Sequence, residues 1–248
     1  MFKIAHISDI HLPASKQGEL RGVYPYSRLE KIIQQIDPKN YQAIFFTGDI
    51  AQGGNLNAYQ LFCDAMKKIE IPCYFIGGNH DDEVMMKNVL STHQNFHFEK
   101  IINIDGWTFI FIDSVKKGSI EGYVSEEEIN FLKQLLKTIK PKQQIAIVVH
   151  HHLFPVGVPA VDKYPITNAK EVWKVIRAYD QIKLIVYGHV HESYSGRKEH
   201  VSLESAPSTS FQFNHKFEDH HDRTLIGFKE YTFDADGYLA ATHWLAVH

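Results

Sequence analysis

Eight polar side chains of this sequence stand within four residues of the ends of short apolar runs, and their types are those that bind metal ions. They are Asp9, His11, Asp49, Asn79, His80, His150, His189 and His191. An amide or imidazole buried without a partner would cost about 1–3 kcal/mol, so these groups must face something polar. Imidazole nitrogens with carboxylate and amide oxygens, without sulfur, suit Mn, Fe, Zn, Co or Ni and do not select among them. The set therefore indicates a metal site.

The spacing of these residues suits two ions. Asp9 and His11 are two residues apart, as are His189 and His191, and alternate residues of an extended segment point the same way. Two ions that share a carboxylate would use seven of the eight residues: Asp9, His11 and His191 on one ion, Asn79, His150 and His189 on the other, and Asp49 between them. His80 is left over, and we expect it to protonate a leaving alkoxide or to stabilise phosphoryl charge. Asn79 is also placed to contact a phosphate oxygen.

The charge of such a site matches one class of substrate. Two divalent ions contribute +4, Asp9 and Asp49 contribute −2 and a bridging hydroxide contributes −1, which leaves about +1 when the ligating histidines are neutral. A phosphodiester carries a single negative charge. Two metals roughly 3.5–4 Å apart lower the pKa of a bridging water and hold the attacking and leaving oxygens of an in-line displacement. We therefore expect hydrolysis of a phosphodiester by attack of the bridging hydroxide.

The elements that position these residues are short buried strands. The apolar runs before them are Phe2–Ser8, Ala43–Thr47, Cys73–Ile76, Ile145–Val149 and Leu184–Tyr187. Helical periodicity at 27–36 and 56–69 separates the first three runs. This alternation predicts parallel strands with right-handed crossovers, whose carboxyl ends meet at one edge of the sheet. Open α/β sheets bind their ligands at that edge.

Further helices are expected outside the sheets. They are predicted at 83–90, at 125–139, where Ser125 and Glu128 form a capping box, and at 168–179. The dipeptide Asp105-Gly106 predicts a hairpin between strands at 97–104 and 107–112.

The last part of the chain is expected to complete a two-sheet core. The prolines and glycine of 154–165 predict a loop that forms a wall or lid over the strand ends. Residues 193–248 are expected to be mostly antiparallel strands of the second sheet. The fold class is therefore α/β, with two β-sheets packed as a sandwich and flanked by helices, in a single domain that spans 1–248.

Composition narrows the partners. The chain has 248 residues, of which 44% are hydrophobic, and a net charge of −3, and its lysines and arginines are scattered, so neither nucleic acid nor an anionic membrane is expected. Cys63 and Cys73 are expected to be reduced core residues. No signal-peptide pattern and no apolar run of membrane-spanning length is found, which favours the cytoplasm. The loop at 154–165 and exposed helix faces could mediate a homodimer.

Five motifs in order carry a resemblance to a known family. They are Asp9-x-His11, Gly48-Asp49, Gly78-Asn79-His80-Asp81, His150 and Gly188-His189-Val190-His191, and they span 9–191. This set resembles the calcineurin-like metallophosphoesterase superfamily. The resemblance implies a four-layer αββα architecture of two mixed sheets between helices, and it implies the same assignment of seven metal ligands.

A narrower resemblance concerns the substrate. The segments Thr47–Gln52, His150–His152 and Pro207–Phe213 are similar to those of bacterial class III cyclic-nucleotide phosphodiesterases. This implies hydrolysis of 3′,5′-cyclic AMP to 5′-AMP, with Fe or Mn, and with Zn or Co as further choices. Two positions depart from the pattern: Gly77 stands where proline often precedes the Asn-His pair, and Leu153 stands where proline is usual. The second departure bears on the shape of the following loop.

Other readings of the site stay open at this point. A glycerophosphodiesterase or a broad phosphodiesterase or phosphomonoesterase would use the same ligands, whereas a metal-free binding scaffold would be expected to lack some of them. His151 and His152 could support a ligand or be ordinary loop residues, and Asp81 and Asp113 could orient a histidine or cap a turn. The histidines His6, His93, His97 and His243 are expected to be core or surface residues. Ser208 and Thr209 could line the substrate pocket or belong to a turn. The loop residues His215, Asp219, His220, His221 and Asp222 could bind a metal or form a solvated loop.

Overall fold

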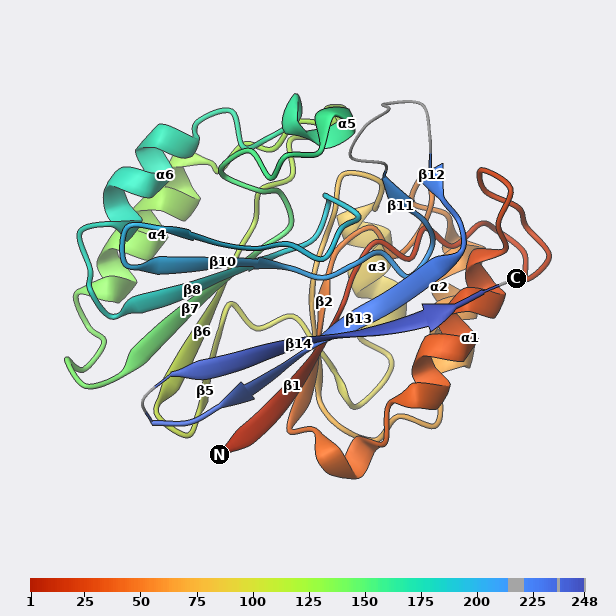
Figure 1. Cartoon of the computed structure of the whole chain (residues 1–248), viewed down its shortest axis with the longest axis horizontal. Coiled ribbons are helices and arrows are strands. Elements are labelled where there is room, and N and C mark those ends of the chain that lie inside the picture. The colour runs from red at the N-terminus through yellow and green to blue at the C-terminus, as the bar shows by residue number, and fades with distance from the viewer. Residues whose placement is uncertain (214–220, 236, 248) are drawn as a thin grey trace.

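A computed structural model of the chain describes residues 1–213, 221–235 and 237–247. Two six-stranded sheets lie face to face at its centre, with helices on their outer faces (Figure 1). The first sheet has the order β14 (Tyr238–Ala246), β13 (Leu225–Phe233), β1 (Phe2–Ile7), β2 (Ala43–Thr47), β3 (Cys73–Ile76) and β4 (Phe96–His97). The second has the order β5 (Ile101–Ile104), β6 (Trp107–Ile112), β7 (Gln144–Val149), β8 (Ile182–Tyr187), β10 (Val201–Ser205) and β9 (Ser195–Lys198). A two-stranded ribbon joins β11 (Gln212–Phe213) to β12 (His221–Asp222).

Helices cover the outer face of each sheet, as the αββα expectation requires. The first sheet carries α1 (Pro25–Gln35), α2 (Leu56–Met66) and α3 (Glu83–Leu90), and the second carries α4 (Glu126–Leu136) and α6 (Ala169–Ile176). Two shorter elements are η1 (Pro38–Asn40) and α5 (Pro159–Asp162), and α5 lies within the segment expected to be loop. The Ser125 hydroxyl caps α4 by accepting a hydrogen bond from Glu128 N at 3.1 Å.

Both faces of the central strands are covered by apolar side chains. In β2, Phe45 packs between the two sheets, whereas Ile44 and Phe46 pack beneath the helices of the first sheet. Successive residues of a strand point to opposite faces, so a strand that is covered on both sides must be apolar at every position. This is why the five runs seen in the sequence were continuous, and all five are strands in the structure.

Parallel pairing brings the ends of these strands together. β1, β2 and β3 are mutually parallel, and so are β6, β7 and β8. The prediction that the carboxyl ends of β1, β2 and β3 lie at one edge of a sheet is confirmed.

Two expectations about the strands were wrong. Residues 97–104 were expected to form one strand, but His97 ends β4 in the first sheet and β5 begins at Ile101 in the second, because the chain crosses between the sheets there. The C-terminal strands were expected in the second sheet, and β9 and β10 lie there, but β13 pairs antiparallel with β1 and β14 with β13 in the first sheet. Residue patterns identify a strand without showing which sheet accepts it.

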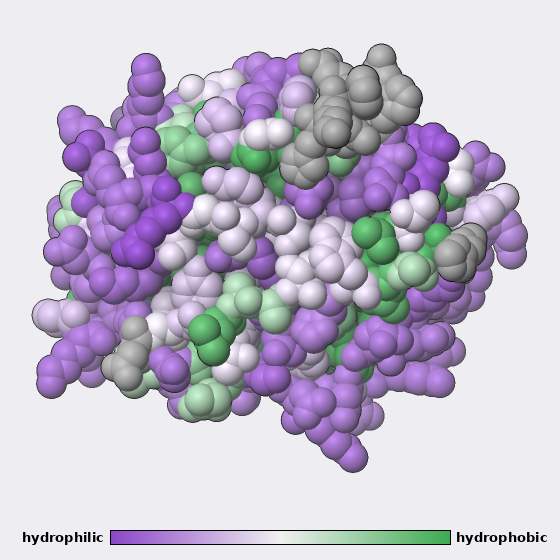
Figure 2. All heavy atoms as spheres, in the orientation of Figure 1, coloured by the Kyte–Doolittle hydropathy of each residue, from purple (hydrophilic) through white to green (hydrophobic). Residues whose placement is uncertain are grey.

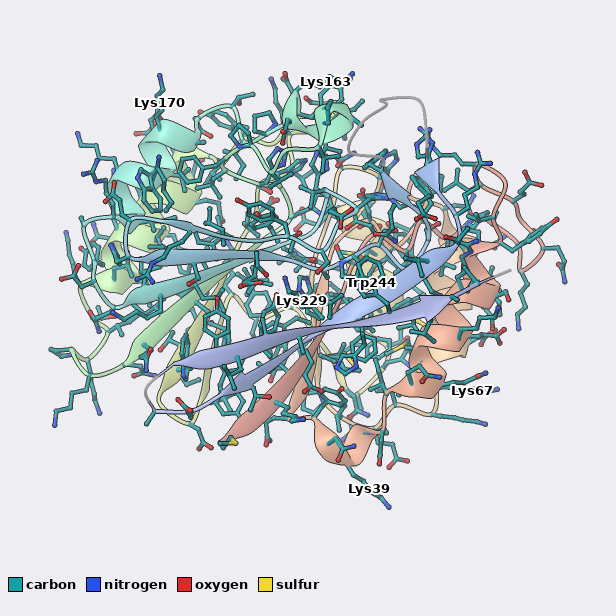
Figure 3. All side chains as sticks on the ribbon, viewed as in Figure 1. Lys39, Lys67, Lys163, Lys170, Lys229 and Trp244 are labelled. Carbon is teal, nitrogen blue, oxygen red and sulfur yellow. The ribbon has the colours of Figure 1, made fainter. Side chains whose placement is uncertain are left out.

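A buried ion pair links the two sheets near their centre. Lys229 of β13 is 1% exposed, and its Nζ lies 2.5 Å from Glu204 Oε2 of β10. In Figure 3, Lys229 lies inside the molecule, whereas Lys39, Lys67 and Lys170 extend from its periphery.

The hydropathy of the surface and of the helices is relevant to the membrane and partner expectations. Hydrophilic residues cover most of the face in Figure 2, and hydrophobic residues appear there in small separate areas. Among the described residues, none of the helices combines the length and the apolar character needed to cross a membrane. Cys63 and Cys73 are both buried and free.

Candidate functional site

All eight residues singled out in the sequence come together in one place. Each lies just past the end of a strand: Asp9 and His11 after β1, Asp49 after β2, Asn79 and His80 after β3, His150 after β7, and His189 and His191 after β8. Four groups of three donor atoms among these side chains and His151 lie within 4.8 Å of one another. The loop residues His215, Asp219 and His220, which the sequence offered as a further group, lie outside the part of the chain that the structure describes.

The backbone at these positions is unusual. Asp9, His11, Asp49, His189 and His191 have φ values of 53°, 52°, 53°, 65° and 49°, in the left-handed region that non-glycine residues rarely adopt. Such positions cost about 1–3 kcal/mol each and persist where the surroundings hold them. His11 N donates to Asp49 O at 2.8 Å and Asp9 N donates to Gly48 O at 3.2 Å, which ties the ends of β1 and β2 together. The paired residues share a cleft through this bend and not, as expected, through extended backbone.

Gly48 and Gly78 allow these ends to approach closely. Gly48 has a φ of 91°, and a Cβ built there would lie 2.6 Å from His150 Nδ1. A Cβ built on Gly78 would overlap Asp49 Oδ1. No side chain fits at either position without moving a residue of the site.

One group consists of Asp9, His11 and His191. His11 Nδ1 lies 2.9 Å from Gln52 Oε1, and His191 Nδ1 lies 2.9 Å from Phe211 O. Because both oxygens only accept, each Nδ1 carries the proton and each Nε2 of the neutral ring presents a lone pair. The two Nε2 atoms face each other at 2.9 Å, and Asp9 Oδ1 is 3.5 Å from His191 Nε2. Lone pairs this close repel, so the arrangement fits a cation between them.

The second group consists of Asn79, His150 and His189. His150 Nδ1 donates to Thr47 O at 2.5 Å, which leaves Nε2 to face Asn79 Oδ1 at 3.2 Å. His189 Nδ1 lies 3.1 Å from the same oxygen, and its buried Nε2 has no hydrogen-bond partner among the described residues. Three potential ligand atoms therefore converge here as well.

Asp49 lies between the two groups. Its Oδ2 is 3.6 Å from His11 Nε2 and 3.6 Å from His150 Nε2. Its other oxygen accepts a hydrogen bond from His80 N at 2.8 Å, so the carboxylate is fixed in place. This is the position from which one carboxylate can serve two ions.

The pKa values of the buried histidines and aspartates indicate that the site favours the binding of cations. Burial lowers the pKa of His11 to about 4 and that of His191 well below its usual value, so both rings are neutral at pH 7, as metal ligation requires. Burial also opposes a charge on His150, but the Asp49 carboxylate outweighs it and raises the pKa of His150 to about 9. Burial, with a contribution from Asp49, raises the pKa of Asp9 to about 7. In the absence of metal, Asp49 thus favours a proton on His150, and burial favours one on Asp9; a metal ion supplies positive charge at the same place and displaces these protons. The donor set fits two metal ions on this basis.

Asp81 supports the site through backbone amides and a tyrosine, and its carboxylate has no hydrogen bond to a histidine in the part of the chain that the structure describes. Its carboxylate accepts hydrogen bonds from Ala51 N at 2.9 Å, Gly78 N at 3.0 Å and Tyr59 Oη at 3.1 Å. The bond from Ala51 joins the loop after β2 to the loop after β3, and the bond from Tyr59 ties the latter loop to α2. Asp113 has the turn role, since its Oδ1 accepts from Val115 N at 2.8 Å.

His151 and His152 pack behind the site. His151 Nε2 donates to Ile120 O at 3.1 Å and its Nδ1 lies 2.8 Å from Ser114 Oγ, so both nitrogens are in use. Its ring packs on that of His189, with centroids 4.6 Å apart. His152 is fully buried, and neither of its nitrogens has a hydrogen-bond partner among the described residues. Neither histidine forms a hydrogen bond to a side chain of the two groups.

The structure reveals supporting residues that sequence reasoning missed. Gln52, the Thr47 carbonyl and the Phe211 carbonyl orient His11, His150 and His191. Gln52 and Phe211 lie in the segments Thr47–Gln52 and Pro207–Phe213, which was the only available signal. His6 lies in the core, with Nε2 2.8 Å from Thr47 Oγ1. Ser208 has a structural role, because its hydroxyl donates to Asp9 O at 2.7 Å.

Six of the eight site residues line a cleft of about 430 Å³, whereas Asp9 and His150 are not part of its lining. The cleft is lined by His11, Asp49, Asn79, His80 and the two histidines that follow β8, His189 and His191. Its wall also includes Arg21, Phe211 and Phe213. The segment 154–165 contributes Ala160, Val161, Lys163 and Tyr164, so it does form a wall of the cleft.

Comparison with known proteins places this geometry in a family. A sequence model of the family Calcineurin-like phosphoesterase matches residues 2–193. The chain is 29% identical over 240 residues to the 3′,5′-cyclic adenosine monophosphate phosphodiesterase CpdA of Vibrio vulnificus, with 96% of this chain and 87% of that protein covered. It is 34% identical to a probable cyclic nucleotide phosphodiesterase of Colwellia psychrerythraea, with 85% and 81% covered.

Solved structures show the same fold. A dimetal phosphatase from Danio rerio superposes with a TM-score of 0.67 at 12% identity, covering 96% of this chain and 98% of that one. GAP50 of Plasmodium, described as the anchor in the inner membrane complex, gives a TM-score of 0.66 at 15% identity, covering 100% and 89%. The match over residues 2–193 and the identity to the Colwellia protein show that the chain belongs to the calcineurin-like phosphoesterase family.

Proposed function

We propose that this protein is a metal-dependent phosphodiesterase that hydrolyses 3′,5′-cyclic AMP to 5′-AMP. Metal-dependent hydrolysis is supported mainly by one observation: potential ligand atoms converge on both sides of Asp49. Its Oδ2 is 3.6 Å from His11 Nε2 in one group and 3.6 Å from His150 Nε2 in the other. The substrate is supported by the relatives, several of which are named as cyclic AMP phosphodiesterases.

The proposed ligands follow the two groups. Asp9, His11 and His191 would hold one ion, Asn79, His150 and His189 the other, and Asp49 would be shared. Fe and Mn are the proposed metals, with Zn and Co as alternatives, because the donors are nitrogen and oxygen without sulfur. When bound, the ions supply a Lewis-acidic centre that activates water and offsets the charge of the phosphoryl group.

His80 is the proposed general acid. Its backbone N is anchored to Asp49 Oδ1 at 2.8 Å, and its ring lies edge-on to the His11 ring, with centroids 4.9 Å apart. Within the described residues neither ring nitrogen of His80 is hydrogen-bonded, and the side chain is half-buried at the edge of the cleft. A ring nitrogen of His80 is therefore free to give a proton to the leaving oxygen and to regain one from solvent.

Asn79 has two proposed roles. Its Oδ1 faces the nitrogens of His150 and His189 at 3.2 and 3.1 Å. The Nδ2 of the same amide is then the donor that remains to hold a phosphate oxygen. This orients the diester beside His80.

Hydrolysis assays test the proposal. The purified protein is incubated with cyclic AMP and with a generic aryl phosphodiester, with and without Mn²⁺. Cleavage of cyclic AMP to 5′-AMP that depends on the metal is expected, and failure of a metal-loaded preparation to cleave either diester would show the proposal to be wrong.

Two further substrates separate the alternatives. A higher kcat/KM for a glycerophosphodiester or for a phosphomonoester than for cyclic AMP would keep the metal chemistry and replace the substrate. Metal analysis of the same preparation checks the remaining reading, since a metal-free scaffold would bind no stoichiometric metal.

A further inference from the structure

A second and larger cavity adjoins the cleft. It has a volume of about 880 Å³ and lies between α3, the end of β3 and the loop that follows β6. Asn79 and His80 line both cavities and are the residues that the two linings share. The volume falls within the range of small-molecule sites, roughly 300–1,000 Å³.

Gly77 keeps the cavity open beside Asn79. Its φ lies outside the left-handed region, so its backbone would accept any residue. A Cβ built there would meet only Met86 Cε, at an ordinary contact distance of 3.7 Å, whereas a Cβ on Gly78 would overlap Asp49. Glycine at 77 is therefore required neither by the turn nor by crowding. Since Gly77 and Met86 both line the cavity, a longer side chain at 77 would occupy it.

The walls of the cavity suit a weakly polar group. Half-buried apolar side chains line it, namely Met85, Val89, Phe98 and Val115, together with the buried Ile76. Apolar walls with a few polar groups at the edge are typical of sites for neutral organic ligands.

The charges at the rim do not suit a second phosphate. Lys87 pairs with Glu83, and Lys100 pairs with Glu128. The carboxylate of Asp113 also lines the rim. Two of the three lysines in the lining are thus paired, and the acids Asp82 and Asp113 offset the third, Lys117, so the rim offers an anion little net attraction. A neutral aromatic ring with polar edges is the chemistry that fits.

We infer that this cavity binds the base of a nucleoside phosphodiester while the phosphate lies in the cleft. The inference rests on the proposed function and adds to it the place where the substrate is recognised. His80 borders both cavities, so the alcohol whose oxygen it protonates continues from the cleft into the cavity. The phenylalanine and tyrosine rings of the cleft are already engaged. Phe211 and Phe213 pack on His191 with centroids 4.7 and 4.6 Å apart, and Lys163 Nζ lies over the Tyr164 ring, 5.5 Å from its centroid.

Adenosine, which lacks a phosphate, tests the site without turnover. Equilibrium dialysis against the metal-free protein is carried out with the wild type, Val89→Phe and Val115→Phe. Both variants add a ring to the cavity from different elements, α3 and the loop after β6, so misfolding of one leaves the other informative. Gln60→Phe is the matched control, because it adds the same ring to an exposed position of α2 outside both cavities.

The expected result is binding of adenosine by the wild type and Gln60→Phe, weakened at least about tenfold in both cavity variants. Absence of binding by the wild type at millimolar adenosine overturns the inference. So does unchanged binding by the folded cavity variants. Phe213→Ala tests the alternative that the base binds in the cleft against Phe213. Loss of adenosine binding in that variant alone would place the base in the cleft and overturn the inference.

A kinetic comparison separates this inference from the proposed function. The substrates are cyclic AMP and a ribose 3′,5′-cyclic phosphate that lacks the base, both with Mn²⁺. The ratio of their kcat/KM values is expected to favour cyclic AMP and to fall about tenfold in Val89→Phe. Equal kcat/KM values in the wild type would refute the base site and leave the phosphodiesterase intact. Binding of adenosine without cleavage of either substrate would support the base site and refute the phosphodiesterase.

Discussion

Replacing Gly78 with alanine would test whether Asp49 must lie where the structure places it. A Cβ at position 78 overlaps Asp49 Oδ1 and the Asp49 backbone nitrogen, and it lies 2.8 Å from Cγ. Favourable contacts between carbon atoms begin at about 3.5 Å, so the carboxylate or the turn must move by roughly 1 Å. Asp49 would then leave the position between His11 and His150.

The size of the effect follows from this displacement. Metal–ligand distances tolerate only about 0.2 Å, so a shift of roughly 1 Å removes Asp49 as a shared ligand. Loss of a supporting group alone weakens metal binding by about 10–100-fold, and loss of the shared ligand is expected to weaken it at least that much. Overpacking should also lower the free energy of unfolding by about 1–3 kcal/mol.

The neighbouring glycine provides the control. At Gly77 a Cβ meets only Met86 Cε at 3.7 Å. Gly77→Ala should therefore keep the metal affinity and raise the free energy of unfolding by about 0.4–1 kcal/mol, because alanine restricts the unfolded chain.

The assay compares both variants with the wild type after removal of metal by a chelator. Mn²⁺ binding is measured by calorimetric titration, and the free energy of unfolding is measured with guanidinium chloride. The reasoning is refuted when Gly78→Ala binds Mn²⁺ as tightly as Gly77→Ala does.

Three further predictions concern other residues. His80→Ala should keep both ions but lose about 10²–10⁴-fold in turnover, and loss of metal in this variant, measured by plasma mass spectrometry, would make His80 a ligand instead. Burial, aided by the charge of Lys229, lowers the pKa of His6 to about 3 in the folded protein, while the unfolded chain binds a proton near pH 6.5. The stability that the neutral ring contributes is therefore present above pH 6.5 and is lost as the pH falls below it. Between pH 7.5 and 5, the free energy of unfolding of the metal-free wild type should fall about 2 kcal/mol further than that of His6→Asn, and equal pH dependence of the two proteins in urea denaturation would contradict this. Lys229→Ala should lower the free energy of unfolding by about 3–5 kcal/mol, because Glu204 is left buried without its partner. Lys3→Ala, which breaks a partly exposed pair with Glu230, should lower it by about 1 kcal/mol or less, and similar losses in the two variants would show that burial does not set the difference.

The sequence was sufficient where one local pattern had one structural meaning. The continuous apolar runs before Asp9, Asp49 and Asn79 could only be strands covered on both faces, and the helices between them made those strands parallel. From this, the meeting of the residues after β1, β2 and β3 at one sheet edge followed without any contact being known. His150, His189 and His191 follow strands of the second sheet, and their approach to that edge depends on how the two sheets pack.

The geometry within the site could not be predicted in the same way. Asp9, His11 and Asp49 adopt left-handed φ values that local preferences disfavour, and they are held by hydrogen bonds between different loops, such as His11 N to Asp49 O. The partners that orient His150 and His191 are the backbone carbonyls of Thr47 and Phe211, which are distant in sequence and carry no side-chain signal.

Local sequence patterns also could not show which of the two sheets a strand joins. The strand at Leu225–Phe233 was recognised, but its antiparallel pairing with β1 depends on where the chain returns after β10. The crossing between β4 and β5 was missed for the same reason, because nothing between His97 and Ile101 distinguishes a bend from a change of sheet.

The central claim is that residues on both sides of Asp49 hold two metal ions which together make this chain a phosphodiesterase. Titration of the metal-free protein with Mn²⁺, with cyclic AMP hydrolysis followed at each addition, tests it most directly. The account predicts that activity rises with added metal and reaches its plateau at two equivalents per chain. A plateau at one equivalent, or no hydrolysis at any amount of metal, would contradict it.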